Sequence, residues 1–288
     1  MFIKTWEAFR RWNRARKIRN RNSINRMFHQ RYKLGVLAIM KNEAMNLEEW
    51  VGHYLWQGID QIYLIDNGST DNSASLLQPW IDQGVVKLIQ LEEPYKQKAH
   101  YRTAFKKFHI ADQCQWLMIA DLDEFWFCKK EGVNIREALN HCDEFDVIYT
   151  NWSIFGSSGH KAHPADLRTQ FLMRQKGLGH HLNTKWICQT IILGDLEDLD
   201  VHKIRGACSS RTISDNEMFQ INHYITQSLE YFTKIKMTRG DATNKIEENT
   251  RNIDYFNRYN EPCIVKDTLL SDMVLDDSIL LRTKLGEL

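Results

Sequence analysis

The feature that most constrains the fold is a short apolar run followed by a polar loop and a helix, a unit that recurs along the chain. Apolar runs occupy residues 34–40, 61–65, 85–89 and 116–120, and a helical pattern follows the first from about Met45 to Trp56. Such runs predict buried strands, and their alternation with helices indicates right-handed βαβ units in a mostly parallel sheet. Ligands of such sheets bind outside the carboxyl ends of the strands, so the polar loops there are the places to search.

Two aspartates follow the fourth apolar run. The alternation of an extended chain puts Asp121 and Asp123 on one side and Leu122 on the other. Two carboxylates at the end of a buried strand repel each other and are costly to desolvate unless a cation joins them. Their oxygens suit Mg²⁺ or Mn²⁺, which usually share their coordination shell with substrate phosphates. We therefore predict a metal site here, with an ordinary structural loop as the alternative.

Three motifs follow the predicted strands in order: Met40-Lys41-Asn42-Glu43, Asp66-Asn67-Gly68-Ser69-Thr70-Asp71 and Asp121-Leu122-Asp123-Glu124-Phe125. Together they resemble the nucleotide-sugar glycosyltransferases of the family 2 type, especially the branch similar to family 92. The likeness covers roughly residues 34 to 242 and includes Trp152-Ser153-Ile154-Phe155-Gly156, Lys185, Val201-His202, Ile221-Asn222-His223-Tyr224, Gln227-Ser228, Phe232, Lys234 and Arg239-Gly240. It implies a single α/β domain of the glycosyltransferase A type, with a Rossmann-like, mostly parallel sheet flanked by helices.

The resemblance also implies how a nucleotide diphosphate sugar is held. The base and ribose would contact the loops that carry Asn42, Glu43, Asp66 and Asn67. A carboxylate such as that of Asp66 can accept the N3–H of uracil, and the alternative for this residue is a solvated turn. Cationic candidates for the diphosphate are Lys98, Arg102 and Lys185; for the first two, a solvated helix face is the alternative.

For the metal, the resemblance implies that Asp121 lies near the ribose and the ion, and that Asp123 connects to the diphosphate through Mn²⁺ or Mg²⁺. Either His223 or His202 would complete the metal shell, because neutral imidazole suits Mn²⁺. The implied transfer is inverting and needs a general base. The chain has no clear Gln-x-x-Arg-Trp element, and the base therefore stays open among Asp195, Glu197, Asp198 and Glu124.

The formal net charge of +1 hides a basic N-terminus on an acidic body. Residues 1–33 contain eleven Lys and Arg side chains and one Glu, a net charge of +10, and the remaining 255 residues carry −9. Aromatic residues at 2, 6, 9 and 12 recur at helical spacing, so we predict an amphipathic basic arm that lies on an anionic membrane. A helix packed on its own domain, a disordered tail and a nucleic-acid-binding arm are the alternatives.

Composition also bears on compartment and domain organisation. No apolar run reaches the roughly 18 residues of a membrane span, and the N-terminus lacks the apolar core of a signal peptide. We therefore expect a cytoplasmic protein, peripheral on the inner face of the cell membrane. The six cysteines form no Cys-x-x-Cys pair and are expected to be reduced. Residues 34–242 are predicted as the catalytic domain, and residues 243–288 as a helical extension packed on it.

The predicted function is metal-dependent, inverting transfer of a sugar from a UDP-sugar, with galactose as the first donor expected from the resemblance. The expected acceptor is a cell-surface glycan or a lipid-linked one, such as lipopolysaccharide or capsule, and no nucleic-acid partner is expected. One alternative is a phosphatase of the haloacid-dehalogenase type with Asp121 as nucleophile, although Phe125 stands where that motif has Thr or Val. The other is a non-enzymatic module that binds membranes or nucleic acid through the basic arm.

Overall fold

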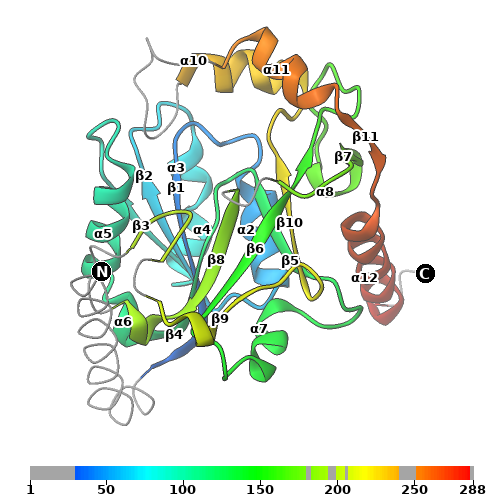
Figure 1. The fold of residues 1–288 in the computed structure, drawn as a ribbon. Coiled ribbons are helices and arrows are strands. Elements are labelled where there is room, and N and C mark those ends of the chain that lie inside the picture. Colours follow the sequence, from blue (N-terminus) through cyan, green and yellow to red (C-terminus); the bar gives the residue numbers. More distant parts are fainter. Residues whose placement is uncertain (1–29, 180–182, 194–198, 205–206, 240–250, 286–288) are drawn as a thin grey trace, which may run out of the picture.

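The computed structural model describes residues 30–179, 183–193, 199–204, 207–239 and 251–285, and a mixed β-sheet lies at its centre (Figure 1). Four parallel strands form one half in the spatial order β3-β2-β1-β4: β1 (Tyr32–Met40), β2 (Gln61–Asp66), β3 (Val86–Gln90) and β4 (Cys114–Ile119). The four apolar runs are confirmed as strands to within two residues. The register pairs Met40 with Asp66 and Asp66 with Gln90, so the loops after these strands begin at one edge of the sheet.

The other half of the sheet is largely antiparallel. β8 (Thr184–Gln189) lies antiparallel between β4 and β6 (Val147–Phe155), and β7 (Met173–Gln175) connects β6 to the edge strand β11 (Cys263–Lys266). β10 (Phe219–Tyr224) pairs in parallel with β6 and antiparallel with β5 (Glu124–Cys128), and β9 (Thr212–Ser214) pairs in parallel with β6. The predicted α/β class is confirmed, but parallel pairing dominates only the first half, where helices cross between neighbouring strands.

Helices cover both faces of the sheet. Alternate residues of β1 belong to two hydrophobic clusters on opposite faces, one shared with α2 (Leu47–Trp56) and the other with α5 (Gln97–Lys107). The period of two in a strand explains this division, since neighbouring side chains point to opposite faces. The other helices of this part are short: α3 (Ser73–Leu76), α4 (Gln78–Asp82), α6 (Ile110–Gln113), α7 (Ile135–Ala138) and α8 (Leu167–Gln170).

Gly35 allows close packing beside β1. A Cβ atom at this position would lie 2.8 Å from Cys114 Sγ and 3.1 Å from a ring carbon of Tyr63, closer than side chains tolerate. A larger residue here would therefore push against two neighbouring strands.

The C-terminal part crosses one end of the sheet. After β10 the chain forms α9 (Leu229–Tyr231), the π-helical segment η5 (Phe232–Lys236) and α10 (Met237–Arg239). α11 (Ile253–Asn260) packs against η5, where the Phe232 ring contacts Tyr255 and Phe256. α12 (Leu269–Leu285) packs against α8 at the side of the molecule (Figure 1). The predicted helical extension thus includes two helices, but its strand β11 joins the sheet and was not predicted.

The predicted basic arm falls on residues 1–33, of which 1–29 lie outside the described part. Its last two residues, Tyr32 and Lys33, already belong to β1. Within the described part of the chain, no helix combines the length and the apolar composition needed to cross a bilayer.

Candidate active site

A pocket of about 330 Å³ opens at the carboxyl ends of β1, β2 and β4. Its floor comes from the loops after these strands, and its wall comes from β6, from the end of β10 and from the C-terminal helices. Charged and histidine side chains in the lining are Lys41, Glu43, Asp121, Asp123, His202, His223, Lys236, Arg239 and Arg251. The pocket lies at the carboxyl ends of the parallel strands, the region in which the sequence analysis searched for a ligand site.

Lys185 was predicted to bind the diphosphate, but it lies buried outside the pocket lining and holds Asp121 instead. Lys185 is fully buried, and its Nζ lies 2.8 Å from Asp121 Oδ2 and 3.5 Å from Glu124 Oε1. Burial alone would disfavour the charged forms, but the Lys185 ammonium holds the pKa of Asp121 below its ordinary value, and the carboxylates raise the pKa of Lys185. The pKa of Glu124 is raised well above its ordinary value, because burial and the neighbouring aspartates outweigh Lys185. Lys185 therefore favours the ionised form of Asp121, whereas burial favours the protonated form of Glu124.

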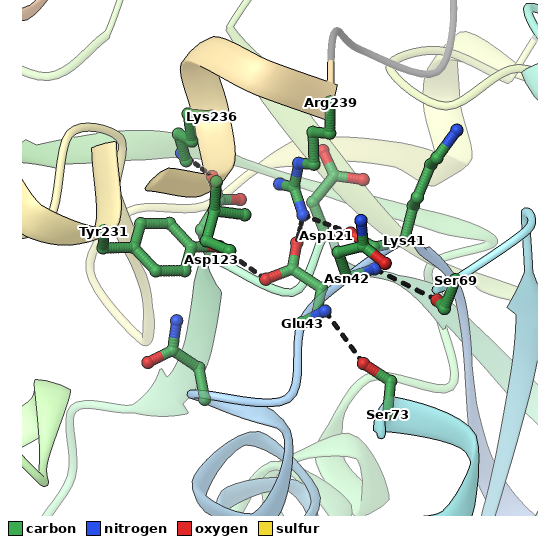
Figure 2. A network of polar contacts seen from close by, with 12 residues as sticks. Lys41, Asn42, Glu43, Ser69, Ser73, Asp121, Asp123, Tyr231, Lys236 and Arg239 are labelled. Atoms are coloured by element: carbon green, nitrogen blue, oxygen red, sulfur yellow. Dashed lines mark hydrogen bonds and ion pairs between the residues drawn. The ribbon is translucent and has the colours of Figure 1, made fainter. Parts of the chain in front are cut away.

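Asp123 has two nitrogen partners. Lys236 of η5 forms an ion pair with Asp123 Oδ2, and His223 Nε2 lies 3.5 Å from the same oxygen. The burial of Asp123 would raise its pKa, but Lys236 and His223 hold that pKa well below its ordinary value. Lys236 Nζ also donates a hydrogen bond to the Ile225 carbonyl oxygen at 2.6 Å. Asp123 is therefore ionised at neutral pH, and Figure 2 shows the Lys236 side chain pointing at it.

Glu43 connects the loop after β1 with the C-terminal helices (Figure 2). Its carboxylate forms an ion pair with Arg239 and accepts a hydrogen bond from the Tyr231 hydroxyl at 2.5 Å. The Arg239 guanidinium also donates to the Lys41 carbonyl oxygen at 2.6 Å, and the Glu43 backbone N–H donates to Ser73 Oγ at 2.9 Å. Residues almost 200 positions apart in the sequence thus close this side of the pocket.

The other predicted nucleoside-binding residues mainly shape the loops. Asn42, in the left-handed region at φ 53°, accepts a hydrogen bond from the Thr70 N–H at 2.7 Å, and Asp66 accepts one from the Ser69 N–H at 2.9 Å. Neither lines the pocket, whereas Asn67 does. The positive φ of Asn42 fits the tolerance of asparagine for this region.

Several predicted residues lie elsewhere. Lys98 is 53% exposed and pairs with Asp200 at 2.6 Å, and neither Lys98 nor Arg102 lines the pocket, although their helix contributes Gln97. Glu124 is fully buried behind Asp121, outside the lining, which does not suit a base that must reach an acceptor hydroxyl. The remaining base candidates, Asp195, Glu197 and Asp198, fall outside the described residues.

The chemistry of the donor set fits a divalent cation that is shared with a phosphate. No group of three His, Cys, Asp or Glu side chains in the described ranges lies close enough to hold an ion. However, Asp123 and His223 face each other across 3.5 Å, and the lining also includes Asp121 and His202. Because Mg²⁺ and Mn²⁺ are commonly bound by one or two protein groups together with substrate phosphates, a carboxylate and an imidazole suffice as the protein share.

Sequence reasoning did not assign a site role to the cations and aromatics of the C-terminal part. Lys236, Arg239 and Arg251 line the pocket together with Tyr255 and Tyr259 of α11. The spacing of three between Lys236 and Arg239 puts both on one helical face, and this was the available signal.

Comparison with known proteins gives the chain a family. The model of glycosyltransferase family 92 matches residues 37–259. A family 92 protein of Ricinus communis is 24% identical over 270 residues, which cover 85% of this chain and 47% of that protein. One of Arabidopsis thaliana is 26% identical over 140 residues, which cover 44% of this chain and 22% of that protein. The chain spans about half the length, or less, of these curated relatives.

Solved structures show weaker likeness. Staphylococcus aureus TarS 1–349 in complex with UDP has a TM-score of 0.43 and 14% identity, covering 65% of this chain and 60% of that one. GalNAc-T7 with UDP, GalNAc and Mn²⁺ has a TM-score of 0.42 and 12% identity. The match covers 86% of this chain and 57% of that one. We transfer no residue role from these structures. The family model, which spans more than two thirds of the sequence, places the chain in glycosyltransferase family 92.

Proposed function

We propose that this protein is a glycosyltransferase that uses a UDP-sugar as donor. The observation that carries the proposal is the pocket itself, at the carboxyl ends of the parallel strands. There Asp123 pairs with Lys236 and lies 3.5 Å from His223, and Arg239 belongs to the same lining. Its volume of about 330 Å³ falls within the usual range of small-ligand sites, about 300–1,000 Å³.

The cations of the pocket suit a diphosphate. Four of them line it, namely Lys41, Lys236, Arg239 and Arg251, against three carboxylates, those of Glu43, Asp121 and Asp123. The planar guanidinium of arginine matches the oxygens of a phosphate group, and lysine supplies a compact charge on a flexible stem. A donor with two phosphates would therefore find its counter-charges in the wall formed by the C-terminal helices.

For the metal, we propose Asp123 and His223 as the protein ligands, with Asp121 and His202 in the same lining. When bound, Mn²⁺ or Mg²⁺ would neutralise the charge that develops on the departing nucleotide diphosphate. Lys185 keeps Asp121 ionised and fixed in position from behind, so the pair acts as a support for the ligand-binding loop.

Transfer with inversion requires a base near the acceptor hydroxyl. We retain Asp195, Glu197 and Asp198 as candidates for this role. Galactose as the donor sugar, and a cell-surface glycan or lipid-linked acceptor such as lipopolysaccharide or capsule, remain part of the proposal. We also propose that the protein lies in the cytoplasm on the inner face of the membrane, with residues 1–33 bound to anionic lipid.

Membership of family 92 favours glycosyl transfer over the phosphatase and binding-module alternatives.

A panel of UDP, GDP, CMP and dTDP sugars tests the donor, with and without Mn²⁺, by thermal shift and by hydrolysis of the donor. We expect a UDP-sugar with Mn²⁺ to raise the melting temperature most, because a ligand at 100 times its Kd stabilises by about 2.7 kcal/mol. Asp123→Asn should abolish metal-dependent donor hydrolysis with the fold retained. Asp276→Asn, at an exposed position of α12, should behave as wild type. Full hydrolysis by Asp123→Asn, or no response to any UDP-sugar, would reject the proposal.

A further inference from the structure

Lys236 is an unusual partner for a carboxylate that is expected to bind a metal. Only 2% of the residue is exposed, and its ammonium contacts Asp123 Oδ2 and the Ile225 carbonyl oxygen. It also lines the pocket, so it faces the same space as the donor. A buried ammonium is stable only with such partners, because its desolvation is costly.

The metal and Lys236 need the same oxygen atom. His223 Nε2 lies 3.5 Å from Asp123 Oδ2, and two neighbouring ligands of an octahedral ion with bonds of about 2.1 Å are about 3 Å apart. The distance between Asp123 Oδ2 and His223 Nε2 is therefore close to the distance between two neighbouring ligands of one ion. An ion held by both would contact Oδ2, the oxygen with which Lys236 forms its ion pair.

We propose that Lys236 competes with the divalent cation for Asp123 and leaves it for the diphosphate of the donor, so that cation and diphosphate bind cooperatively. This inference rests on the proposed function, since it requires a diphosphate in the pocket. Its consequence is that the donor-free enzyme binds the divalent cation weakly.

The contacts of Lys236 allow this exchange. An ammonium has three donors on a flexible stem, so it can turn toward a phosphate and keep its hydrogen bond to Ile225. Arg239, by contrast, is engaged by the carboxylate of Glu43 and the carbonyl of Lys41. Within the described part of the chain, Asp123 is the one carboxylate that forms an ion pair with Lys236. Lys236 is therefore the cation that gives up its carboxylate partner, Asp123, and contacts a phosphate group of the donor instead.

Mn²⁺ titration of the full chain tests the competition directly, with free Mn²⁺ followed by electron paramagnetic resonance, in the absence and presence of UDP. Lys236→Met removes the charge at similar volume, and Lys236→Gln is a second neutral variant. Lys236→Arg keeps the charge. The matched control is Lys234→Met on the same π-helical segment, because Lys234 is 67% exposed and pairs with Glu230.

Without UDP, we expect the neutral variants at 236 to bind Mn²⁺ about tenfold or more tightly than wild type, since close charge pairs commonly couple by that much. Lys236→Arg and Lys234→Met should keep the weak wild-type affinity. UDP should tighten Mn²⁺ binding strongly in wild type and much less in Lys236→Met, and Mn²⁺ should tighten UDP binding by the same factor.

Equal or weaker Mn²⁺ binding by folded Lys236→Met and Lys236→Gln, relative to wild type, would overturn the competition. Circular dichroism verifies that each variant is folded. Failure of UDP to bind any of the proteins at any Mn²⁺ concentration would instead reject the proposed function. The two failures are distinguishable because the titration without UDP depends only on Asp123, His223 and Lys236.

Discussion

The variant Lys185→Met tests how much the buried ion pair behind the pocket contributes to the stability of the fold. Lys185 is fully buried, with its ammonium 2.8 Å from Asp121 and 3.5 Å from Glu124. Methionine preserves most of the volume and removes the charge, so the variant leaves Asp121 without its partner. Glu124, whose burial raises its pKa well above the ordinary value, also loses its contact with the ammonium.

The expected loss follows from the burial of the pair. Removing one partner of a buried ion pair costs about 3–5 kcal/mol. The Asp121 side chain is 31% exposed and can regain part of its hydration, so we expect the lower end, about 3 kcal/mol. At about 2–4 °C per kcal/mol for a chain somewhat smaller than this one, the melting temperature should fall by about 6–12 °C.

Calorimetry and urea unfolding measure this loss, with Lys98→Met as the matched control. Lys98 also pairs with an aspartate, Asp200, but it is 53% exposed, and such pairs contribute about 1 kcal/mol or less. The double variant Asp121→Asn/Lys185→Met should recover most of the stability, since both charges are then gone. The reasoning is wrong if Lys185→Met is as stable as Lys98→Met, or if the double variant is no more stable than the single one.

Two further predictions concern packing and pH. Gly35→Ala should lower the free energy of unfolding by about 1–3 kcal/mol in urea, because the new Cβ would press on Cys114 Sγ; an unchanged midpoint would contradict the tight contact. Lysine neighbours hold the pKa of Asp121 and Asp123 low against the effect of burial, so the ionised forms stabilise the fold above about pH 3.9. In an acid titration, the free energy of unfolding should decline as the pH falls below about 4. The decline should be less steep in the double variant Asp121→Asn/Lys185→Met, and parallel curves for the two proteins would refute this prediction.

The strands and their loops could be predicted because each strand and helix unit is a local pattern. The apolar run at 116–120 and the aspartates that follow it are adjacent in sequence, so their arrangement needs no knowledge of distant segments. The same pocket lining includes His202 and His223, the two histidines named from the family resemblance. Lys185 differs from that expectation, because it lies buried behind Asp121 and not in the lining.

Contacts between distant segments could not be predicted in the same way. Helical spacing shows that Lys236 and Arg239 share a face, but their partners Asp123 and Glu43 lie 113 and 196 positions away. The same limit applies to Lys98, which was expected beside the nucleotide. Spacing indicates which face of α5 it occupies, whereas its pairing with Asp200 depends on how a later loop packs.

The ion pair between Glu43 and Arg239 also has a consequence for biosynthesis. Domains emerge from the ribosome N-terminus first, so β1 to β4 are available for pairing well before residue 239 is translated. Until then the loop after β1 lacks the guanidinium that binds the Glu43 carboxylate and the Lys41 carbonyl. The pocket therefore stays incomplete until the segment from Lys236 to Tyr259, which supplies its last wall, has been translated.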